Sequence, residues 1–354
     1  MPAQRDRPGL PPAGRGFARE RTRLLPWLAG ALLFAALAAL APFLGGFALS
    51  VLTLVFIFGY FGQSWNLMTG LTGQLSIGHA LYVGIGGYTV VLLSTRYGVS
   101  PWLGLPLGAL IAAAVGAATG WLGFRFSVRG FQFALLTIAF AEFARIVFDN
   151  WELVGGTAGL FLPALKPGTS PLAALRGDAR FFYLASLTLT AFGTALTAWL
   201  RSASYGYVWR AIRDDEEVAR ALGVRSFRHK IGATVLSAAM TAIGGGLYGL
   251  MNGSLFPDTM MGLGLSIDII IGPIVGGLGT AFGPLIGALL VIPLTQEMTA
   301  LGTRLGLFGL NSVADGLVLI AVVWFLPQGL WPAIMNFASR FGRSRATVEA
   351  TAVL

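Results

Sequence analysis

Cysteine is absent from this 354-residue chain, and lysine and histidine occur only twice each. The missing cysteines exclude disulfides, thiolate metal sites and cysteine nucleophiles. Neither Lys166 nor Lys230 lies in a G-x-x-x-x-G-K-[ST] pattern, so the chain has no phosphate-binding loop of that kind. The H-E-x-x-H and G-x-S-x-G patterns are also missing. We therefore expect no catalytic residues, no metal and no cofactor.

Charge is scarce as well, at 11% of residues, whereas 55% are hydrophobic and the mean hydropathy is +0.75. This composition is typical of an all-α polytopic integral membrane protein. We predict about ten transmembrane helices, with eight or nine as alternatives. Segments 266–279 and 284–298 are short enough to form either two spans or one re-entrant hairpin. The hydrophobic runs are 24–44, 46–68, 76–95, 102–124, 131–150, 181–200, 231–251, 266–279, 284–298 and 313–331.

The basic residues predict the orientation of the chain in the lipid bilayer. With the N-terminus inside, 18 of the 24 Lys and Arg residues fall in segments predicted to be cytoplasmic. Those segments are 1–23, 125–130, 201–230 and 332–354. Positive charge favours the inner side of a bacterial membrane, so we expect both termini to be cytoplasmic. The basic excess therefore reflects topology, and we expect no nucleic-acid partner.

Composition also divides the chain into regions. Residues 1–23 are rich in Pro, Gly and Arg and are predicted to be a disordered cytoplasmic tail. A transmembrane domain over 24–331 contains a long external loop at 151–180, and 332–354 forms a cytoplasmic C-terminal tail. The first hydrophobic run is long for a signal peptide, so we expect a retained span. The alternative is cleavage near residues 36–38.

The segment 201–230 is a charged island that carries eleven formal charges between two uncharged stretches. Asp214 and Asp215 are predicted to cap a short helix, with Glu216 and Glu217 in its first turn. Gly223 can end that helix in a left-handed conformation. Contiguous carboxylates on a helix point in different directions, which favours capping over metal binding. We expect a compact helix–turn–helix at the cytoplasmic surface.

Two Gly-rich regions interrupt the helical pattern, at 66–88 and at 272–287. Irregular backbone at membrane depth is tolerated where it is buried in protein or lines a cavity. The alternative is that the glycines only allow helices to approach closely. The sequence leaves both explanations open.

Few ionisable side chains are embedded in the hydrophobic runs, so each one is a candidate. Glu142 and Arg145 are three residues apart and can pair on one helix face, either as a structural bridge or on a transport route. His79 can be a hydrogen-bonded packing residue or a gating group. Asp268 is expected at the outer start of its segment, as a cap or at a pore mouth. Asp315 is expected to form a capping box with a residue three positions before it.

Four segments of the chain have a distinctive order and spacing: Asn66–Tyr88, Arg210–Val224, Gly276–Gly287 and Pro327–Leu330. Together they resemble the branched-chain amino acid ABC transporter permeases, LivM-type. The resemblance extends from about residue 46 to 331, and its order and spacing are more specific than any one motif. The departures are Val218 where a coupling motif has Ala, Leu326 where relatives often have Arg, and Pro273 in a run that is usually aliphatic.

The resemblance implies a permease subunit of an ATP-driven importer in the bacterial inner membrane. Its partners would be a LivH-like permease subunit, two ABC ATPase subunits and an external solute-binding protein. We expect the ATPase contact to be shaped by Arg210, Asp214, Asp215, Glu217, Ala219 and Gly223. Candidates for the translocation path are Gln74, Ser76, His79, Glu142 and Asp268.

Other functions remain open from the sequence. The same architecture could import urea, short amides or other amino acids. A proton-coupled secondary transporter could relay protons through Glu142, His79 and Asp268, without any ATPase. An integral membrane enzyme would need a convergent nucleophile or metal set, which the sequence does not offer.

Overall fold

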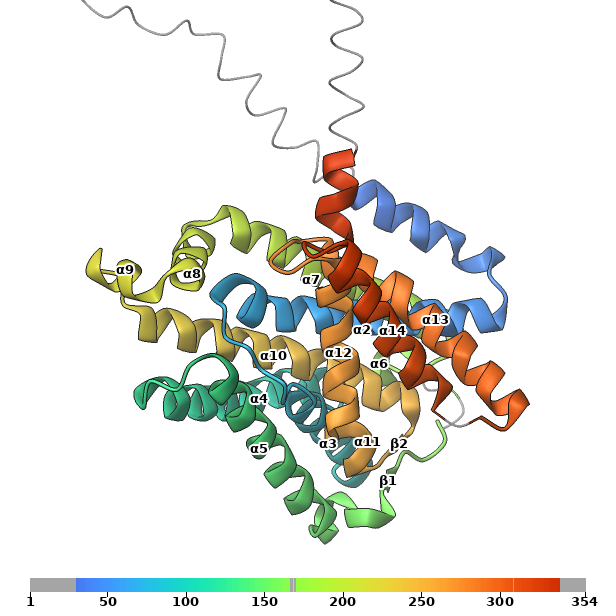
Figure 1. Ribbon diagram of the computed structural model, residues 1–354. Helices are drawn as coiled ribbons and strands as arrows, with labels where there is room; N and C mark the ends of the chain where they lie inside the picture. The colour runs from blue at the N-terminus through green and yellow to red at the C-terminus, as the bar shows by residue number, and fades with distance from the viewer. Residues whose placement is uncertain (1–29, 166–167, 169, 308, 338–354) are drawn as a thin grey trace, which may run out of the picture. The chain divides into compact units, whose positions relative to one another are not determined.

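Helices account for most of the chain in the computed structural model, which describes residues 30–165, 168, 170–307 and 309–337 (Figure 1). The predicted tail at 1–23 and most of the one at 332–354 lie outside the described residues. Backbone contacts divide the chain into Met1–Phe43 and Leu44–Leu354. The described part of the first unit is an apolar helix, Gly30–Phe43, which ends in the 3-10 turn η1 (Ala41–Phe43). All the other elements belong to the second unit.

The second unit follows the order of the predicted hydrophobic runs. The long helices are α2 (Gly46–Thr72), α3 (Ala80–Arg96), α4 (Pro101–Arg125), α5 (Gly130–Asp149), α7 (Ala179–Ser202), α10 (Ser226–Asn252), α12 (Leu263–Gly276), α13 (Gly283–Leu305) and α14 (Leu310–Phe325). The shorter elements are η2 (Glu152–Val154), η3 (Gly156–Ala158), α6 (Pro171–Ala174), α8 (Ser204–Asp214), α9 (Glu216–Ala221) and α11 (Pro257–Met261). Strands β1 (Leu160–Phe161) and β2 (Ser254–Leu255) pair antiparallel, with Leu160 opposite Leu255.

Seven helical segments in the described residues are long and apolar enough to cross a membrane. They are α2, α4, α5, α7, α10, α13 and the stretch Pro257–Gly276 formed by α11 and α12. Helix α3 has 17 residues, and Gly30–Phe43 and Leu310–Val322 are shorter apolar helices. The protein is therefore an all-α polytopic membrane protein, while the count of ten crossings stays a prediction.

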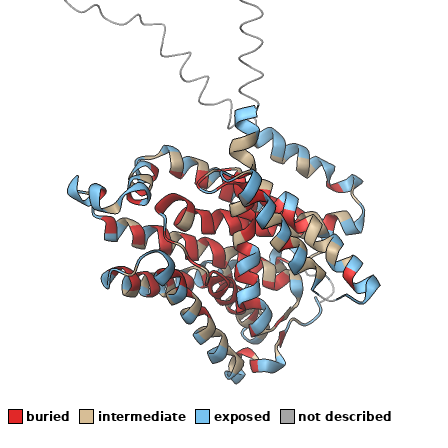
Figure 2. Ribbon diagram, in the orientation of Figure 1, coloured by how far each residue is buried: buried red, intermediate tan, exposed pale blue. Residues whose placement is uncertain are grey.

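Helices α2 and α10 form the centre of the second unit. Helix α10 packs against α2, α3 and α4, and α2 also packs against α7, α12 and α13. Figure 2 shows buried residues concentrated on these central helices, with more exposure on α5, α9 and α14. Residues 55–68 of α2 are all buried, so this helix is enclosed by protein on every side.

Backbone contact between α3 and α10 depends on two glycines. A Cβ atom at Gly86 would overlap the carbonyl oxygen of Ala242, and one at Gly245 would overlap that of Val83. Only glycine therefore allows the two helices to approach this closely. Close helix contact is the explanation that applies to this part of the first Gly-rich region.

Both Gly-rich regions also contain a true break between helices. Residues 73–79 link α2 to α3, and residues 277–282 link α12 to α13. In the second region a Cβ at Gly276 would overlap the carbonyl oxygen of Gly283, so the flanking helices are in close contact as well. By length and composition, residues 266–298 fall in two candidate spans, Pro257–Gly276 and Gly283–Leu305.

Three expectations about the C-terminal half are wrong in detail. Asp268 lies within α12 and does not start it, because the helical segment already begins at Pro257. The last predicted run ends early: α14 stops at Phe325, and a new helix starts at Leu330. Asp315 caps nothing, because Gly309 is the N-cap of α14. Its buried carboxylate instead accepts a hydrogen bond from Thr295 Oγ1 at 2.6 Å.

We predict that Gly245→Ala destabilises the protein by about 1–3 kcal/mol, because the added methyl group forces α3 and α10 apart. Thermal unfolding of the purified protein in detergent measures this. The control is Gly232→Ala on the same helix, where a Cβ would meet nothing within 4 Å. That change should be neutral or stabilise by up to about 1 kcal/mol. Equal melting temperatures for the two variants would contradict the backbone contact.

Candidate functional site

The charged island forms two helices between α7 and α10, as expected. Helix α8 buries Gly206, Trp209 and Ile212, which places one face against α2, α7 and α10. Helix α9 buries only Ala219. The island is therefore anchored through α8, and α9 projects from the edge of the second unit (Figure 1).

Local capping positions α9. The Asp215 carboxylate accepts hydrogen bonds from the backbone N–H groups of Glu217 at 2.8 Å and Val218 at 3.0 Å. Gly223 has a φ of +88°, and its N–H donates to the Arg220 carbonyl at 2.9 Å. A glycine in this left-handed conformation ends the helix without strain. Asp215 and Gly223 thus act as predicted, whereas Asp214 is the last residue of α8 and is not a cap.

The outer face of α9 is exposed and partly apolar. Val218 and Leu222 lie four residues apart and are 55% and 80% exposed. Residues four apart share one helix face, so they form a small apolar strip there. Asp214 and Glu217 are also exposed, and Glu217 makes only a solvent-exposed pair with Arg129. In the sequence Val218 stands out only as a departure from a motif, and Leu222 was not selected, because the exposure of a helix face depends on how the helix packs.

Arg210 is half-buried and bonds to backbone groups where α7 and α8 meet. Its Nε donates to the Gly206 carbonyl at 3.0 Å, and its Nη2 donates to the Arg201 carbonyl at 3.2 Å. The second bond satisfies a carbonyl in the last turn of α7, which has no partner within that helix. Arg210 therefore fixes α8 against the end of α7.

Arg213 connects α8 to the end of α2. Its Nη1 donates to the Gly70 carbonyl at 2.7 Å, 143 residues away in the sequence. Its side chain also packs against Gly73, where a Cβ atom would lie 3.0 Å from Arg213 Cγ. A charged donor on a backbone carbonyl is among the stronger protein hydrogen bonds. Arg213 was not predicted, because no local pattern indicates a contact of such long range.

Asn66 extends this connection to the link between α12 and α13. It is fully buried; its Oδ1 accepts from the Gly279 N–H at 2.7 Å, and its Nδ2 donates to the Thr280 carbonyl at 2.9 Å. The other side of the link packs against the turn at 326–332, where Phe282 and Trp331 have ring centroids 5.3 Å apart. The segments 66–88 and 276–287, which are far apart in the sequence, therefore contact each other at this link.

A buried ion pair holds α9 to α10. Lys230 Nζ lies 3.1 Å from both carboxylate oxygens of Glu216 and 4.5 Å from the centroid of the Phe124 ring. The Lys230 side chain is 5% exposed and the Glu216 side chain 18%. A lysine buried this far needs its carboxylate, because leaving either charge unpaired would be costly.

The predicted path residues Gln74, Ser76 and His79 lie together in the link between α2 and α3, and all three are buried. His79 Nδ1 is 3.0 Å from Ser76 Oγ, and its Nε2 is 2.8 Å from Ser237 Oγ on α10. Gln74 Nε2 donates to the Thr72 carbonyl at 3.1 Å. Both imidazole nitrogens therefore have hydroxyl partners, and the ring is held between two elements.

Two further hydroxyls, neither of which was predicted, fix the same link. Thr137 Oγ1 on α5 accepts from the Ile77 N–H at 3.0 Å. Ser266 Oγ on α12 accepts from the Ala80 N–H at 3.0 Å, at the start of α3. Both acceptors satisfy backbone donors that regular secondary structure leaves unpaired. The link is thereby tied to α5, α10 and α12 at once.

Glu142 and Asp268 lie apart from that group. Arg145 pairs with Glu142 and with Asp149 on α5, each at 2.8 Å, and the three side chains are 37% exposed or less. The predicted pair is thus present, with Asp149 as a member that was not predicted. Asp268 is exposed on α12. Among the described residues no group of three or more His, Asp and Glu could hold a metal ion.

The match to a family decides what kind of protein carries this site. Residues 47–325 match the model of the branched-chain amino acid transport system permease component. The chain belongs to this family. The matched range includes every residue of the charged island and of both helix links. No solved structure matches the chain.

Named relatives agree with the family. The chain is 29% identical to the high-affinity branched-chain amino acid permease LivM of Escherichia coli, over 80% of this chain and 69% of that protein. It is 24% identical to LivH of Salmonella typhimurium, over 75% and 88% respectively. The autoinducer 2 import permease LsrC of Yersinia pseudotuberculosis is 28% identical, over 78% and 82%.

We predict that Asn66→Leu destabilises the protein by about 1–3 kcal/mol for each backbone group that loses its partner, namely the Gly279 N–H and the Thr280 carbonyl. Thermal unfolding in detergent measures the change. In the control, Asn150→Leu removes an exposed side-chain bond to the Ile146 carbonyl and should shift stability by less than about 0.5 kcal/mol. If both variants melt at the same temperature, the Asn66 contacts do not hold the link.

Proposed function

We propose that the chain is the LivM-type permease subunit of an ATP-driven importer for branched-chain amino acids. The family match and the LivM and LivH relatives support this assignment. They favour it over a proton-coupled transporter and over a route for urea or short amides. The proposed complex contains a LivH-like permease, two ABC ATPase subunits and an external solute-binding protein.

The ATPase contact is the exposed face of α8 and α9. Val218 and Leu222 supply the apolar strip, and Asp214 and Glu217 supply charges around it. An apolar centre with a charged rim is the usual anatomy of a protein interface. Asp215 and Gly223 act on this contact indirectly, because they set where α9 begins and ends.

The bond from Arg213 to Gly70 is the observation that carries the mechanism. It joins the proposed docking element to the end of the central helix α2. Four residues earlier on α2, Asn66 holds the link between α12 and α13. A displacement of α8 by the ATPase would therefore reach two helix breaks through side chains that are already bonded. Movement of such elements against their neighbours is a known way to alternate access.

The translocation path is proposed to lie at the surface shared with the second permease subunit. Glu142 and Asp268 are accessible on α5 and α12, as path residues must be. Gln74, Ser76 and His79 are buried and bonded to protein groups, so we propose that they shape the link next to the path. Ten crossings with both termini in the cytoplasm would place 201–230 on the ATPase side.

We predict that Gly223→Val and Glu217→Lys abolish substrate uptake while membrane abundance stays normal. The valine strains a backbone at φ +88°, where a Cβ would meet no neighbour within 4 Å, so the end of α9 must shift. The lysine opposes the helix dipole by about 0.3–1 kcal/mol and reverses the charge of the docking face. Uptake, abundance and ATPase co-purification are measured in the same cells.

Matched controls make this test specific. Gly98→Val places valine at φ +64°, again with no neighbour within 4 Å, but in the link between α3 and α4. Glu152→Lys reverses an exposed charge in the long loop after α5. Both controls should transport normally. Normal uptake by Gly223→Val and Glu217→Lys would show that the charged island is an ordinary surface loop. Separately, ATP turnover by the purified chain without ATPase subunits would refute the importer assignment.

We predict that reporter fusions at residues 215 and 345 report a cytoplasmic location and that a fusion at residue 165 reports an external one. Arginine-rich segments then collect on one side of the membrane, as charge asymmetry requires. Paired alkaline phosphatase and fluorescent protein fusions give opposite signals at each point. An external location for residue 215 would contradict the docking face, because ATPase subunits bind from the cytoplasm.

A further inference from the structure

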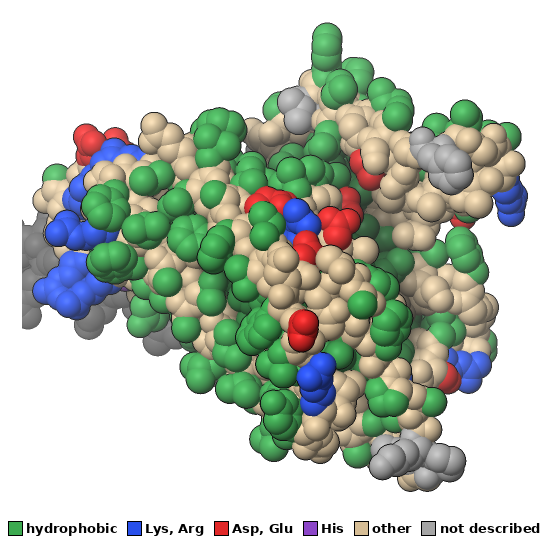
Figure 3. All heavy atoms as spheres, turned by 90° about the horizontal axis from the view of Figure 1, so that it is seen from below, with side chains coloured by type: hydrophobic (Ala, Val, Ile, Leu, Met, Phe, Trp, Pro, Cys, Tyr) green, Lys and Arg blue, Asp and Glu red, His purple; other side chains and the backbone are tan. Residues whose placement is uncertain are grey.

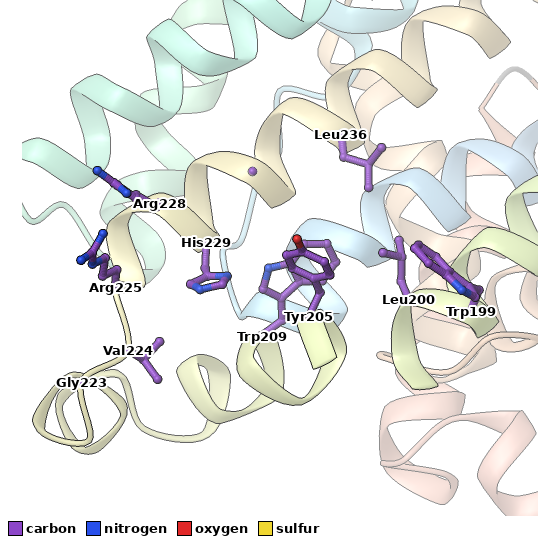
Figure 4. A pocket seen from close by; sticks show the side chains of 11 residues that line it. Trp199, Leu200, Tyr205, Trp209, Gly223, Val224, Arg225, Arg228, His229 and Leu236 are labelled. Carbon is purple, nitrogen blue, oxygen red and sulfur yellow. The ribbon is translucent and has the colours of Figure 1, made fainter. Parts of the chain in front are cut away.

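A pocket of about 640 Å³ lies beside the docking face, between the end of α7, helix α8 and the start of α10 (Figure 4). The proposed function does not use it. Its volume is within the range of small-molecule sites. The pocket is lined by Trp199, Leu200, Tyr205, Trp209, Gly223, Val224, Arg225, Arg228, His229, Gly232 and Leu236.

The two ends of this pocket differ in chemistry. Arg225 and Arg228 gather at one end, while Leu200 and Leu236 lie towards the other (Figure 4). Leu236 lies eleven positions after Arg225, the N-cap of α10, which corresponds to about 16 Å at 1.5 Å per residue. The pocket therefore runs along the axis of a candidate membrane span, from a cationic end into its apolar part.

The cationic end lacks partners for its polar groups. Neither Arg225 nor Arg228 forms a salt bridge with any residue that the structure describes. Trp209 is 4% exposed, and its Nε1 finds no hydrogen-bond acceptor among the described residues. Figure 4 shows this nitrogen on the side of the ring that faces His229. A buried N–H without an acceptor is costly, so the pocket has a place for an oxygen acceptor.

We propose that this pocket binds an anionic phospholipid of the inner leaflet. The phosphate lies among Arg225, Arg228 and His229 and accepts the Trp209 N–H. One acyl chain follows Gly232 and Leu236 into the membrane. A soluble anion would occupy only the cationic end, whereas an amphipathic anion matches both ends. Tyr205, which is more than half exposed, suits the level of the headgroups.

Gly232 gives the acyl chain its space. A Cβ at this position would meet nothing within 4 Å, although the residue lies inside α10. Glycine inside a helix is otherwise unfavourable by about 0.5–1 kcal/mol relative to alanine. A larger side chain at position 232 would fill the pocket without displacing protein atoms. It can therefore prevent lipid binding while the fold stays intact.

The test is native mass spectrometry of the full chain purified with its partner subunits and titrated with phosphatidylglycerol. The double variant R225Q/R228Q should weaken binding of one phosphatidylglycerol roughly tenfold, because each basic group near the headgroup contributes to attraction. Gly232→Leu should weaken it to a similar extent by occupying the acyl site. Phosphatidylcholine should bind wild type and variants alike.

The controls are Arg304→Gln at the end of α13 and Gly264→Leu on α12, where a Cβ also meets nothing within 4 Å. Both should keep wild-type affinity for phosphatidylglycerol. Unchanged affinity in the double variant and in Gly232→Leu would overturn the proposal. So would displacement of the lipid by equimolar inorganic phosphate, which would indicate a soluble anion. Loss of ATPase subunits with unchanged lipid binding would assign the pocket to the protein interface instead.

Discussion

Backbone groups at a helix break inside a membrane protein must find partners within the protein, because the hydrocarbon offers none. This constraint governs both links of the second unit. Side chains from other helices supply the partners: Asn66 for the link between α12 and α13, and Thr137 and Ser266 for the one between α2 and α3. Each break is therefore also a junction of several helices.

The same requirement positions the charged island at 201–230. Arg213 donates to a carbonyl in the last turn of α2, and Arg210 donates to one in the last turn of α7. Both carbonyls lack partners within their own helices. Side chains that satisfy helix ends thus also determine how α8 sits against the core. The residues that complete the hydrogen bonding of these helix ends are thus the same ones that would transmit a displacement in the proposed mechanism.

Local signals predicted the fold class and much of the island. The ten hydrophobic runs each contain a helix, and the spacing of Asp215 and Gly223 correctly gave the start and end of α9. Long-range contacts were not predictable, since Arg213 and Gly70 are 143 residues apart in the sequence. Asp315 was misassigned because its real partner is on α13 and not in its own first turn. A sequence pattern describes neighbours along one helix, whereas these residues act between helices.

The exposed strip of Val218 and Leu222 also bears on the life of the subunit in the cell. An apolar face in contact with water favours association with any available hydrophobic surface. A newly made chain without its ATPase would present that face to chaperones, proteases and other copies of itself. If these residues dock the ATPase as proposed, the survival of this subunit depends on the supply of its partner, and the cell can balance subunit numbers through turnover of unassembled chains.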